Sequence, residues 1–511
     1  MVALKLTQEN NSSRKLDYVM KPNYLISPGS PNRLVKTGNP VRTGNPVIFI
    51  CIFCIAATFL VSCQKQEPVM VNVRPKDMNR TGERYYEEWT QMEVRTVGTL
   101  NRYRQKEILT GRYNDRTDME AEKTGYYYTK QIDGKWWAIS PDGHPLIAIG
   151  INSLNLRASD RVKFTYSVKY GTPENWADDA IPLLQRYGYN GAGSWVDVEQ
   201  VRAYNERHDE HFSYCPQLSL VSGYKDTIDR ARGYHKSNKL FPVFGPGFEE
   251  YCAMRAAELA EYKDDPNLFG YFLDNELTFS RDMLDYYLEL PEDEIGYLAT
   301  TAWLAGKGLN ADSPLTNQVR DAFRAFVLDR YLDVTTNSIR KVDPNHMILG
   351  SRFYWNDRIY YNDNQSGMLT NPLVFETAGK YVDILCCNYY FRWTPVPEEI
   401  NAWTEWSGRP FMITEWYVKA ADTGLPNITG AGWIVGTQKE KGLFYQNFAL
   451  QLLESPNCVG WHWFRYQDKG EWGKRRNSNK GVVDYDFKPY YVALDGMYEL
   501  NKQVYSLRDY F

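Results

Sequence analysis

Two glutamates each follow a short hydrophobic run typical of a β-strand, and their side chains could do acid/base chemistry together. Glu276 follows the run in GYFLDNEL, and Glu415 follows the run in PFMITEWY, 139 residues later. Two carboxyl groups held about 5 to 5.5 Å apart can share the tasks of general acid and nucleophile in the cleavage of a glycosidic bond. We therefore predict that Glu276 and Glu415 form a catalytic pair, provided that the fold brings the two strand ends together.

The elements that must position this pair alternate along the chain from about residue 137. Short runs rich in β-branched and aromatic residues are separated by helical stretches, an order typical of βα units around a parallel sheet. Eight strands are predicted, over residues 146–152, 191–195, 212–220, 269–275, 347–353, 382–390, 411–415 and 458–464. We therefore predict an α/β fold with a (β/α)8 barrel over residues 137–511, which carries both glutamates on its C-terminal face.

Helices are predicted between these strands. The clearest are residues 249–263, 317–342, 438–454 and 490–507. In the second of them apolar residues recur with the helical period, at Val319, Phe323, Phe326, Val327 and Tyr331. Two long inserts, residues 221–248 and 277–316, each follow a predicted strand, so we expect both to rise above the C-terminal face.

The order of these motifs resembles the clan A glycoside hydrolases. That clan has an Asn-Glu pair after its fourth strand and a Glu after its seventh, and Asn275, Glu276 and Glu415 match this order. The resemblance implies that Glu276 is the acid/base, that Glu415 is the nucleophile, and that Asn275 donates to the sugar 2-hydroxyl. It implies a retaining mechanism as well.

Within the clan, the chain is most similar to the β-agarases of glycoside hydrolase family 50. The likeness covers nearly the whole barrel, and its most specific segments are FMITEWYVKAADTG and VGWHWFRYQD. The family usually reads Glu-Phe-His after its nucleophile, whereas this chain has Glu415-Trp416-Tyr417, and the large N-terminal carbohydrate-binding region of many agarases is absent or reduced. The resemblance implies a β-linked galactan of the agarose type as the substrate. Two alternatives stay open: another clan A β-glycosidase, such as a β-galactosidase or β-glucanase, and a surface lipoprotein that binds glycan without cleaving it.

Four further residues are candidates for supporting roles in substrate binding. The resemblance implies that Tyr390 hydrogen-bonds the nucleophile and that Trp463 forms the floor beneath the cleaved sugar, although either could be an ordinary core residue. Asn152 and Arg352, at the ends of the first and fifth predicted strands, are candidate ligands of sugar hydroxyls. The pattern His208-Asp209-Glu210-His211 lacks the spacing of a zinc-binding helix, so a solvated loop is the better interpretation. No metal or cofactor is expected.

Composition narrows the classes of partner. The chain has 59 basic and 63 acidic residues; the first 63 residues hold seven of the basic and two of the acidic ones, so the remainder carries a net charge of −9. Such a charge disfavours nucleic acid as a partner. It also favours a neutral polysaccharide or oligosaccharide over a heavily sulfated one, which would need a local basic pocket that the sequence does not reveal. Five cysteines lie beyond residue 63, widely spaced, and are expected to be buried thiols.

The N-terminal segment has the pattern of a targeting signal. Residues 46–62 form an apolar run that ends at Cys63, which is similar to a bacterial lipoprotein signal whose cysteine becomes lipidated. We therefore divide the chain into a signal region (1–63), an N-terminal extension (64–136) and the barrel (137–511). The prediction is a protein of the bacterial cell envelope, facing the periplasm or on the outer membrane, that contacts the membrane through a lipid anchor; a plain transmembrane anchor is the alternative.

Overall fold

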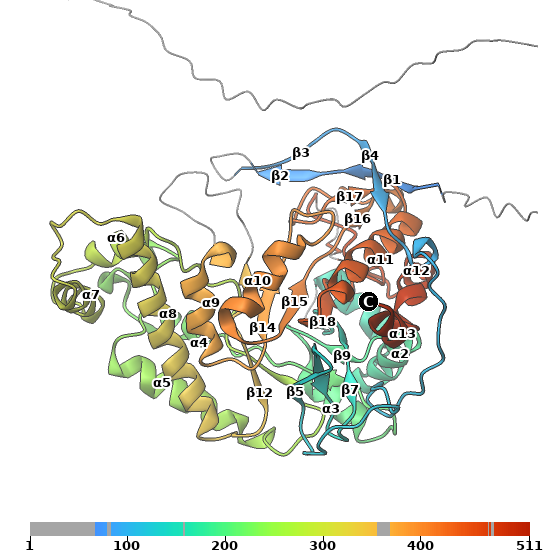
Figure 1. The fold of residues 1–511 in the computed structure, drawn as a ribbon, viewed down its shortest axis with the longest axis horizontal. Helices are drawn as coiled ribbons and strands as arrows, with labels where there is room; N and C mark the ends of the chain where they lie inside the picture. The colour runs from blue at the N-terminus through green and yellow to red at the C-terminus, as the bar shows by residue number, and fades with distance from the viewer. Residues whose placement is uncertain (1–66, 79–82, 157–158, 355–367, 469, 472–474) are drawn as a thin grey trace, which may run out of the picture. The chain divides into compact units, whose positions relative to one another are not determined.

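The computed structural model describes residues 67–78, 83–156, 159–354, 368–468, 470–471 and 475–511. It has a mixed α/β fold whose central feature is a seven-stranded sheet in the order β10-β9-β8-β18-β15-β14-β13, with every neighbouring pair parallel. Helices surround these strands, as Figure 1 shows for α8 to α10 on one side and α11 to α13 on the other. Parallel strands that alternate with helices bear out the α/β class expected from the sequence.

All eight predicted strand regions contain a strand. Their bounds are β8 (Ala148–Ile151), β9 (Gly191–Ala192), β10 (Ser213–Tyr214), β11 (Gly270–Phe272), β12 (Met347–Gly350) with β13 (Phe353–Tyr354), β14 (Leu385–Asn388), β15 (Phe411–Glu415) and β18 (Cys458–Trp463). Most are shorter than predicted, because hydrophobicity marks buried chain and continues past the last ladder hydrogen bond.

The predicted closure of the barrel depends on how β11 and β12 join the larger sheet. The strands β11 and β12 form a separate parallel pair. Two isolated parallel bridges, Tyr214↔Leu268 and Gln217↔Phe272, connect the β10 segment to the β11 segment. The continuous ladders thus cover seven strands in one sheet and two in another, and the closed (β/α)8 barrel stays a prediction.

The helices of the central region agree with most of the predicted ones. Their bounds are α1 (Asp160–Lys169), α2 (Pro173–Arg186), α3 (Val198–Asn205), α4 (Leu220–Thr227), α5 (Pro246–Ala257), α6 (Met283–Leu288), α7 (Ile295–Gly306), α8 (Asn317–Arg340), α9 (Pro372–Gly379), α10 (Pro397–Ser407), α11 (Gln438–Glu454), α12 (Tyr491–Asn501) and α13 (Val504–Tyr510). The predicted helix 490–507 is wrong as one element, since α12 ends at Asn501 and α13 begins at Val504.

Local sequence explains where several helices begin. Four of them start with proline, whose fixed φ and missing N–H suit the first helical position: α2, α5, α9 and α10. Threonine side chains accept a hydrogen bond from a first-turn N–H at α8, where Thr316 caps Val319, and at α11, where Thr437 caps Glu440. In α8 the side chains of Phe323, Val327 and Tyr331 are fully buried, which confirms the predicted apolar face.

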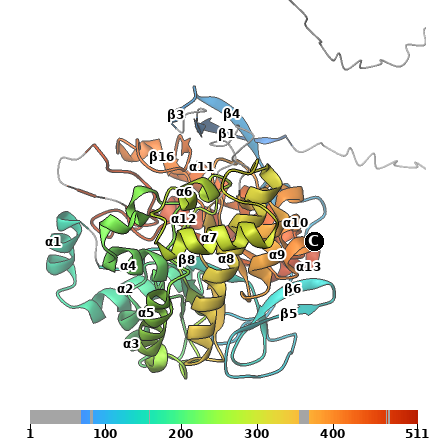
Figure 2. The same ribbon diagram turned by 90° about the vertical axis from the view of Figure 1, so that its left-hand side faces the viewer.

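The N-terminal extension contributes strands that pair with late parts of the chain. β1 (Val69–Arg74) pairs with β4 (Thr90–Val94) and with β17 (Ile434–Val435), which also pairs with β16 (Lys419–Ala420). The hairpin of β2 (Lys76–Met78) and β3 (Arg84–Tyr86) lies beside this sheet, near the top of Figures 1 and 2. Residues just before the first parallel strand form a third small sheet, β5 (Tyr128–Ile132), β6 (Lys135–Ile139) and β7 (Pro145–Leu146), and β6 spans the division drawn at residues 136 and 137.

The predicted signal region lies outside the described residues, and so does Cys63. In the part of the chain that the structure describes, no helix is both long and apolar enough to cross a membrane. The five cysteines beyond residue 63 are free and buried, as expected: Cys215, Cys252, Cys386, Cys387 and Cys458.

Candidate active site

The carboxyl ends of the parallel strands share a feature of the backbone. Non-glycine residues with positive φ follow β8, β9, β10, β11, β12 and β14; they are Ser153, Trp195, Ser219, Glu276, Arg352 and Phe391. Each such conformation costs about 1 to 3 kcal/mol and survives only where surrounding contacts impose it. Backbone strain of this kind concentrates at functional sites, and here it lies on the face to which the sequence assigned the two glutamates.

Glu415 is the last residue of β15 and is held by two donors. Arg352 Nη2 lies 2.6 Å from Glu415 Oε1, and Tyr390 Oη lies 2.5 Å from Glu415 Oε2. Burial raises the pKa of Tyr390 far above its ordinary value, so the phenol stays protonated and acts as the donor. Because both contacts donate to oxygens of Glu415, they fix the orientation of its carboxyl group.

Glu276 lies four residues beyond β11 and is held differently. Its N–H donates to Ser351 O at 3.1 Å, and Glu276 Oε1 accepts from Asn388 Nδ2 at 2.8 Å. Burial, followed by the nearby charge of Glu415, raises the pKa of Glu276 to about 7. The hydrogen bond from Asn388 opposes this shift. The two carboxyl groups are therefore close enough to interact, and Glu276 is the one that can hold a proton near neutral pH.

Asn275 and Asn388 connect the two carboxyl groups into one polar network. Asn275 Oδ1 accepts from Arg352 Nη1 at 2.8 Å and lies 3.4 Å from Asn388 Nδ2. Since both neighbours are donors, they fix the orientation of the Asn275 amide and leave its NH2 group to donate elsewhere. Asn388 is opposite Glu415 in the ladder between β14 and β15, which explains how one residue reaches both strand ends.

Asp274, two residues after β11, anchors the segment that leads to Glu276. This fully buried carboxylate accepts hydrogen bonds from the N–H groups of Val221 and Ser222 at the start of α4, and from Tyr331 Oη on α8. Ser351 Oγ also donates to Tyr331 Oη, at 2.9 Å. The segment before Glu276 is thus tied to α4, to α8 and to the neighbouring strand.

Three of the predicted binding residues are fully buried. Asn152, Arg352 and Trp463 are each 0% exposed. Asn152 Nδ2 and Arg352 Nη2 both donate to Thr414 O, at 2.6 and 3.0 Å, so the contacts of these two residues support a role in positioning β15. The binding of sugar hydroxyls by Asn152 and Arg352, and the role of Trp463 as the sugar floor, stay predictions.

An exposed aromatic residue at this face is Trp195, which was not predicted as a site residue. Its side chain is 37% exposed, and the Arg352 guanidinium lies 4.7 Å from its ring centre. A cavity of about 410 Å³ is lined by Ser153, Asn155, Trp195, Val196, Phe464 and Arg465. An indole in such a cavity offers the flat apolar face on which the C–H face of a sugar can stack. The signal available in the sequence was only that Trp195 ends a predicted strand.

Tyr417, where the chain departs from the family-50 pattern, also lies beside the pair. Its ring makes edge contact with Tyr390 at 5.5 Å between centroids, and it lies 5.6 Å from the ring of Phe464. Gly432 packs against this ring so closely that a Cβ there would come within 2.5 Å of it. The departure thus concerns a residue that touches both a partner of Glu415 and the wall of the cavity.

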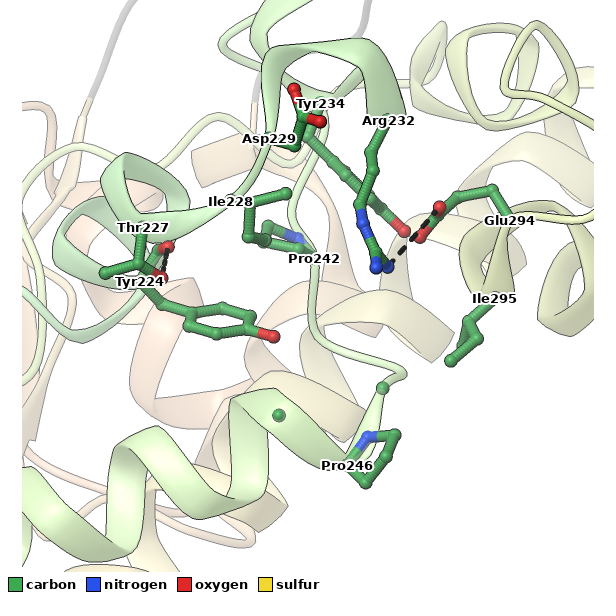
Figure 3. Close-up of a pocket in the computed structure, with 12 residues that line it drawn as sticks. Tyr224, Thr227, Ile228, Asp229, Arg232, Tyr234, Pro242, Pro246, Glu294 and Ile295 are labelled. Atoms are coloured by element: carbon green, nitrogen blue, oxygen red, sulfur yellow. Dashed lines mark hydrogen bonds and ion pairs between the residues drawn. The ribbon is translucent and has the colours of Figure 1, made fainter.

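A larger cavity, about 510 Å³, lies elsewhere, among α4, α5 and α7 (Figure 3). None of the predicted site residues lines it. Its charged groups neutralise one another in part, since Arg232 Nη1 lies 3.8 Å from Glu294 Oε2. The predicted site residues do not line the smaller cavity either, but its wall contacts their network, since Trp195 lies over the Arg352 guanidinium and Phe464 N donates to the carbonyl of Trp416, the residue after Glu415. We therefore place the candidate active site at the smaller cavity beside Glu415.

The His208 to His211 segment has separate partners for its two imidazoles. His208 stacks on Tyr204 with ring centroids 3.9 Å apart, and His211 Nδ1 lies 2.5 Å from Asn267 Oδ1. Within the described residues, no group of three or more His, Cys, Asp or Glu side chains is arranged to hold a metal ion.

Comparison with known sequences finds two β-agarases. The chain is 22% identical to β-agarase B of Vibrio sp. (strain JT0107) over 501 residues, which are 75% of this chain and 49% of that protein. It is 24% identical to β-agarase A of the same strain, over 74% of this chain and 45% of that protein. The chain therefore spans about half the length of these relatives. No family model matches the chain.

Comparison with solved structures gives a fold that covers most of the chain. The crystal structure of BpGH50 has a TM-score of 0.75 at 26% identity and covers 87% of this chain and 96% of that one. The agarase AgWH50C has a TM-score of 0.64 at 20% identity, with 79% of this chain and 67% of that chain covered. These likenesses support family 50 and do not support the further assignment to clan A. The chain is therefore β-agarase-like, and its similarity in sequence and in fold is to the glycoside hydrolases of family 50.

Proposed function

We propose that this protein is a retaining glycoside hydrolase that cleaves β-galactosidic linkages in an agarose-type galactan. The observation that carries the proposal is that two neighbouring carboxyl groups, those of Glu415 and Glu276, have different surroundings. Glu415 lies between Arg352 and Tyr390, which favour a carboxylate, whereas burial and the charge of Glu415 raise the pKa of Glu276 to about 7. Two carboxyl groups whose environments separate their proton affinities can act as nucleophile and acid.

The reaction proceeds in two displacements. In the first, a Glu415 oxygen attacks the anomeric carbon while Glu276 gives its proton to the glycosidic oxygen, and the bond between that oxygen and the anomeric carbon breaks. In the second, Glu276 takes a proton from water, the resulting hydroxide attacks the anomeric carbon, and the bond to Glu415 breaks. Asn275, whose amide NH2 is left to donate, is suited to bind a hydroxyl of the reacting sugar.

The agarose-type substrate is supported by the likeness to the two Vibrio β-agarases and to the family-50 structures. The altered residue Tyr417 keeps open another β-glycosidase specificity, such as that of a β-galactosidase or β-glucanase, because it lies beside Tyr390 and the cavity. A protein that only binds glycan is the remaining alternative, and the presence of both carboxyl groups in one network argues against it.

The fold proposal is a closed (β/α)8 barrel. Its support is the cyclic order in which the eight strand segments neighbour one another, with the bridges at Tyr214 and Gln217 between the third and fourth segments. Backbone hydrogen bonds continue this contact, since Leu218 N donates to Phe272 O at 2.9 Å. In a closed barrel Glu276 and Glu415 would share one rim.

The test of function is incubation of the purified protein with agarose, porphyran, other β-galactans, β-glucans and aryl glycosides. We expect galactan oligosaccharides as products, with the β-configuration at the new reducing end in a proton NMR spectrum taken before mutarotation. Glu276→Gln and Glu415→Gln should abolish release, whereas Glu120→Gln, at an exposed glutamate, should not. Near wild-type turnover by Glu415→Gln, or tight glycan binding with no product, would contradict the proposal.

We also propose secretion and lipid anchoring through Cys63. The support is the apolar run at residues 46–62 and the cysteine at its end. Expression in a bacterium with a labelled fatty acid should label the wild-type protein in the membrane fraction. Cys63→Ser should remove the label; equal labelling of both proteins would contradict the assignment.

A further inference from the structure

The cavity beside Glu415 has an arginine in its wall that forms no ion pair with the described residues. Arg465 lines the cavity, and its Nε is buried without a hydrogen-bond partner among the described residues. Burial lowers the pKa of Arg465, and the opposing charges of Asp468 and Glu415 do not restore it. Arg465 as a whole is half-buried, so a cation in this position, partly removed from water and without an ion-pair partner among the described residues, is well placed to meet a charge that arrives with a ligand.

A second cation lies next to Arg465. Arg465 N donates to Lys480 O at 3.1 Å, which holds the two residues side by side, and Lys480 Nζ packs over the rings of Tyr417 and Phe464 at 5.1 and 5.5 Å. Across the described chain, no hydrogen bond involves Lys480 Nζ. Burial and the charge of Arg465 lower the pKa of Lys480 to about 8. Within the part of the chain that the structure describes, the two cations thus flank Phe464 without an ion-pair partner of their own.

Further positive charge lies behind this pair. Lys419 Nζ donates to the carbonyls of Asn427 and Thr429, and Lys76 Nζ donates to Gly430 O at 2.7 Å, so both lysines are used in holding the loop that follows Asn427. Gly430 in turn packs against Lys480, because a Cβ at this position would lie 2.6 Å from Lys480 Nζ. Lys76 adds to the positive potential without being available to a ligand. Burial and the neighbouring cations lower the pKa of Lys419 well below its ordinary value, so its charge is not counted here.

Asp468, whose charge also acts on Arg465, is already hydrogen-bonded within the fold. Asp468 accepts hydrogen bonds from Asn479 Nδ2, Gly481 N and Tyr490 Oη, which use both of its oxygens. The oxygens of Asp468 therefore accept from donors within the fold. The cavity wall keeps a net positive character, although the overall charge of the chain is −4. A cleft that gathers charge of one sign in a low-dielectric surrounding attracts ligands of the opposite sign.

We propose that Arg465 and Lys480 form a subsite for an anionic substituent, a sulfate ester or a carboxylate, on the galactan unit bound in the 410 Å³ cavity beside Glu415. The proposal rests on the proposed function, and it replaces the expectation of a purely neutral substrate. The guanidinium of Arg465 offers paired donors to two oxygens of an oxyanion, and Lys480 supplies a point charge next to it. Trp195, in the same wall, would stack against the ring of that sugar.

The experiment compares oligosaccharides with one galactan backbone in three forms: neutral, sulfated, and with a galacturonate unit. We expect kcat/KM to be about 10-fold or more higher for at least one anionic form than for the neutral form. The preference should weaken as ionic strength rises. The preferred anionic form shows whether the subsite recognises a sulfate ester or a carboxylate. Equal kcat/KM for all three forms would overturn the subsite.

Two variants test the residues themselves. Arg465→Gln and Lys480→Gln should lower the ratio of anionic to neutral kcat/KM toward one, whereas Lys130→Gln, which removes an exposed charge on β5, should leave the ratio unchanged. An unchanged ratio in both subsite variants would overturn the assignment. If no form is cleaved, the proposed function fails, and calorimetric binding to the Glu276→Gln protein still tests the subsite. Equal affinity for the neutral and anionic forms would then reject it.

Discussion

The Arg352 guanidinium and the Glu415 carboxylate form a buried ion pair, with Arg352 Nη2 2.6 Å from Glu415 Oε1 and side-chain exposures of 0% and 6%. Arg352 also donates to Asn275 Oδ1 and to Thr414 O. One side chain therefore orients Glu415, the Asn275 amide next to Glu276, and the strand that carries Glu415. Since the pair is enclosed, neither charge can be compensated by water when the other is removed.

Arg352→Met should damage both stability and activity. Removal of one partner of a buried pair leaves an uncompensated charge, which lowers the free energy of unfolding by about 3 to 5 kcal/mol. Denaturant unfolding measures this loss. The double variant Arg352→Met/Glu415→Gln should recover part of it, because no buried charge is left; a double variant that is less stable than Arg352→Met would contradict the explanation.

Tyr390→Phe should lower kcat and leave KM nearly unchanged. The phenol donates to the oxygen of Glu415 that Arg352 does not hold, and a hydrogen bond to a charged group is worth about 1.5 to 3 kcal/mol, or roughly 10-fold to 150-fold in rate. Steady-state kinetics on a galactan oligosaccharide give both constants. A rise in KM at constant kcat would instead place Tyr390 in ground-state binding of substrate.

The pH profile should report the proton on Glu276. Because the acid must be protonated, kcat/KM should fall as pH rises through about 7, the raised pKa of this group. The hydrogen bond from Asn388 lowers that pKa, so Asn388→Ala should move the alkaline limb to higher pH. A limb that stays in place or moves to lower pH would rule out Asn388 as the group that tunes the acid.

Stability should depend on the same proton. The folded pKa of Glu276, about 7, is above its ordinary value of 4.5, so the stabilisation from its proton is complete below pH 4.5 and is lost as pH rises through 7. Glu276→Gln cannot lose this contribution, and relative to wild type it should gain up to about 3 kcal/mol between pH 4.5 and 8. Chemical unfolding at several pH values measures the difference. A difference that does not change with pH would be inconsistent with the raised pKa.

Trp195→Ala should weaken glycan binding. Loss of the exposed indole removes an apolar face of the cavity, and burial of such a side chain is worth about 1.5 to 3 kcal/mol, so KM should rise about 10-fold or more. Tyr498→Ala on α12 is a matched control, because Tyr498 has the same 37% exposure and lies outside the cavity lining. A similar KM for both variants would remove Trp195 from the site.

The sequence by itself determined the α/β class, the order of the strands along the chain, and the positions of Glu276 after β11 and of Glu415 at the end of β15. These properties depend on hydrophobic periodicity and on which residue follows a buried run, and both can be read within a short window of the chain. Contact between Tyr390 and Glu415 was expected from the family resemblance, and the structure contains that hydrogen bond.

Only the tertiary structure decided which side chains face the cavity. Trp463 lies at the end of β18 and Asn152 directly follows β8, and both strands are buried on both faces, where alternation between polar and apolar residues gives no signal for direction. The pairing of Arg352 with Glu415 joins residues 63 positions apart. The basic side chains of Lys76, Lys419, Arg465 and Lys480 come from four separate segments, and a net charge averaged over the whole chain conceals them. These basic side chains lie close to one another only because the fold brings the four segments together.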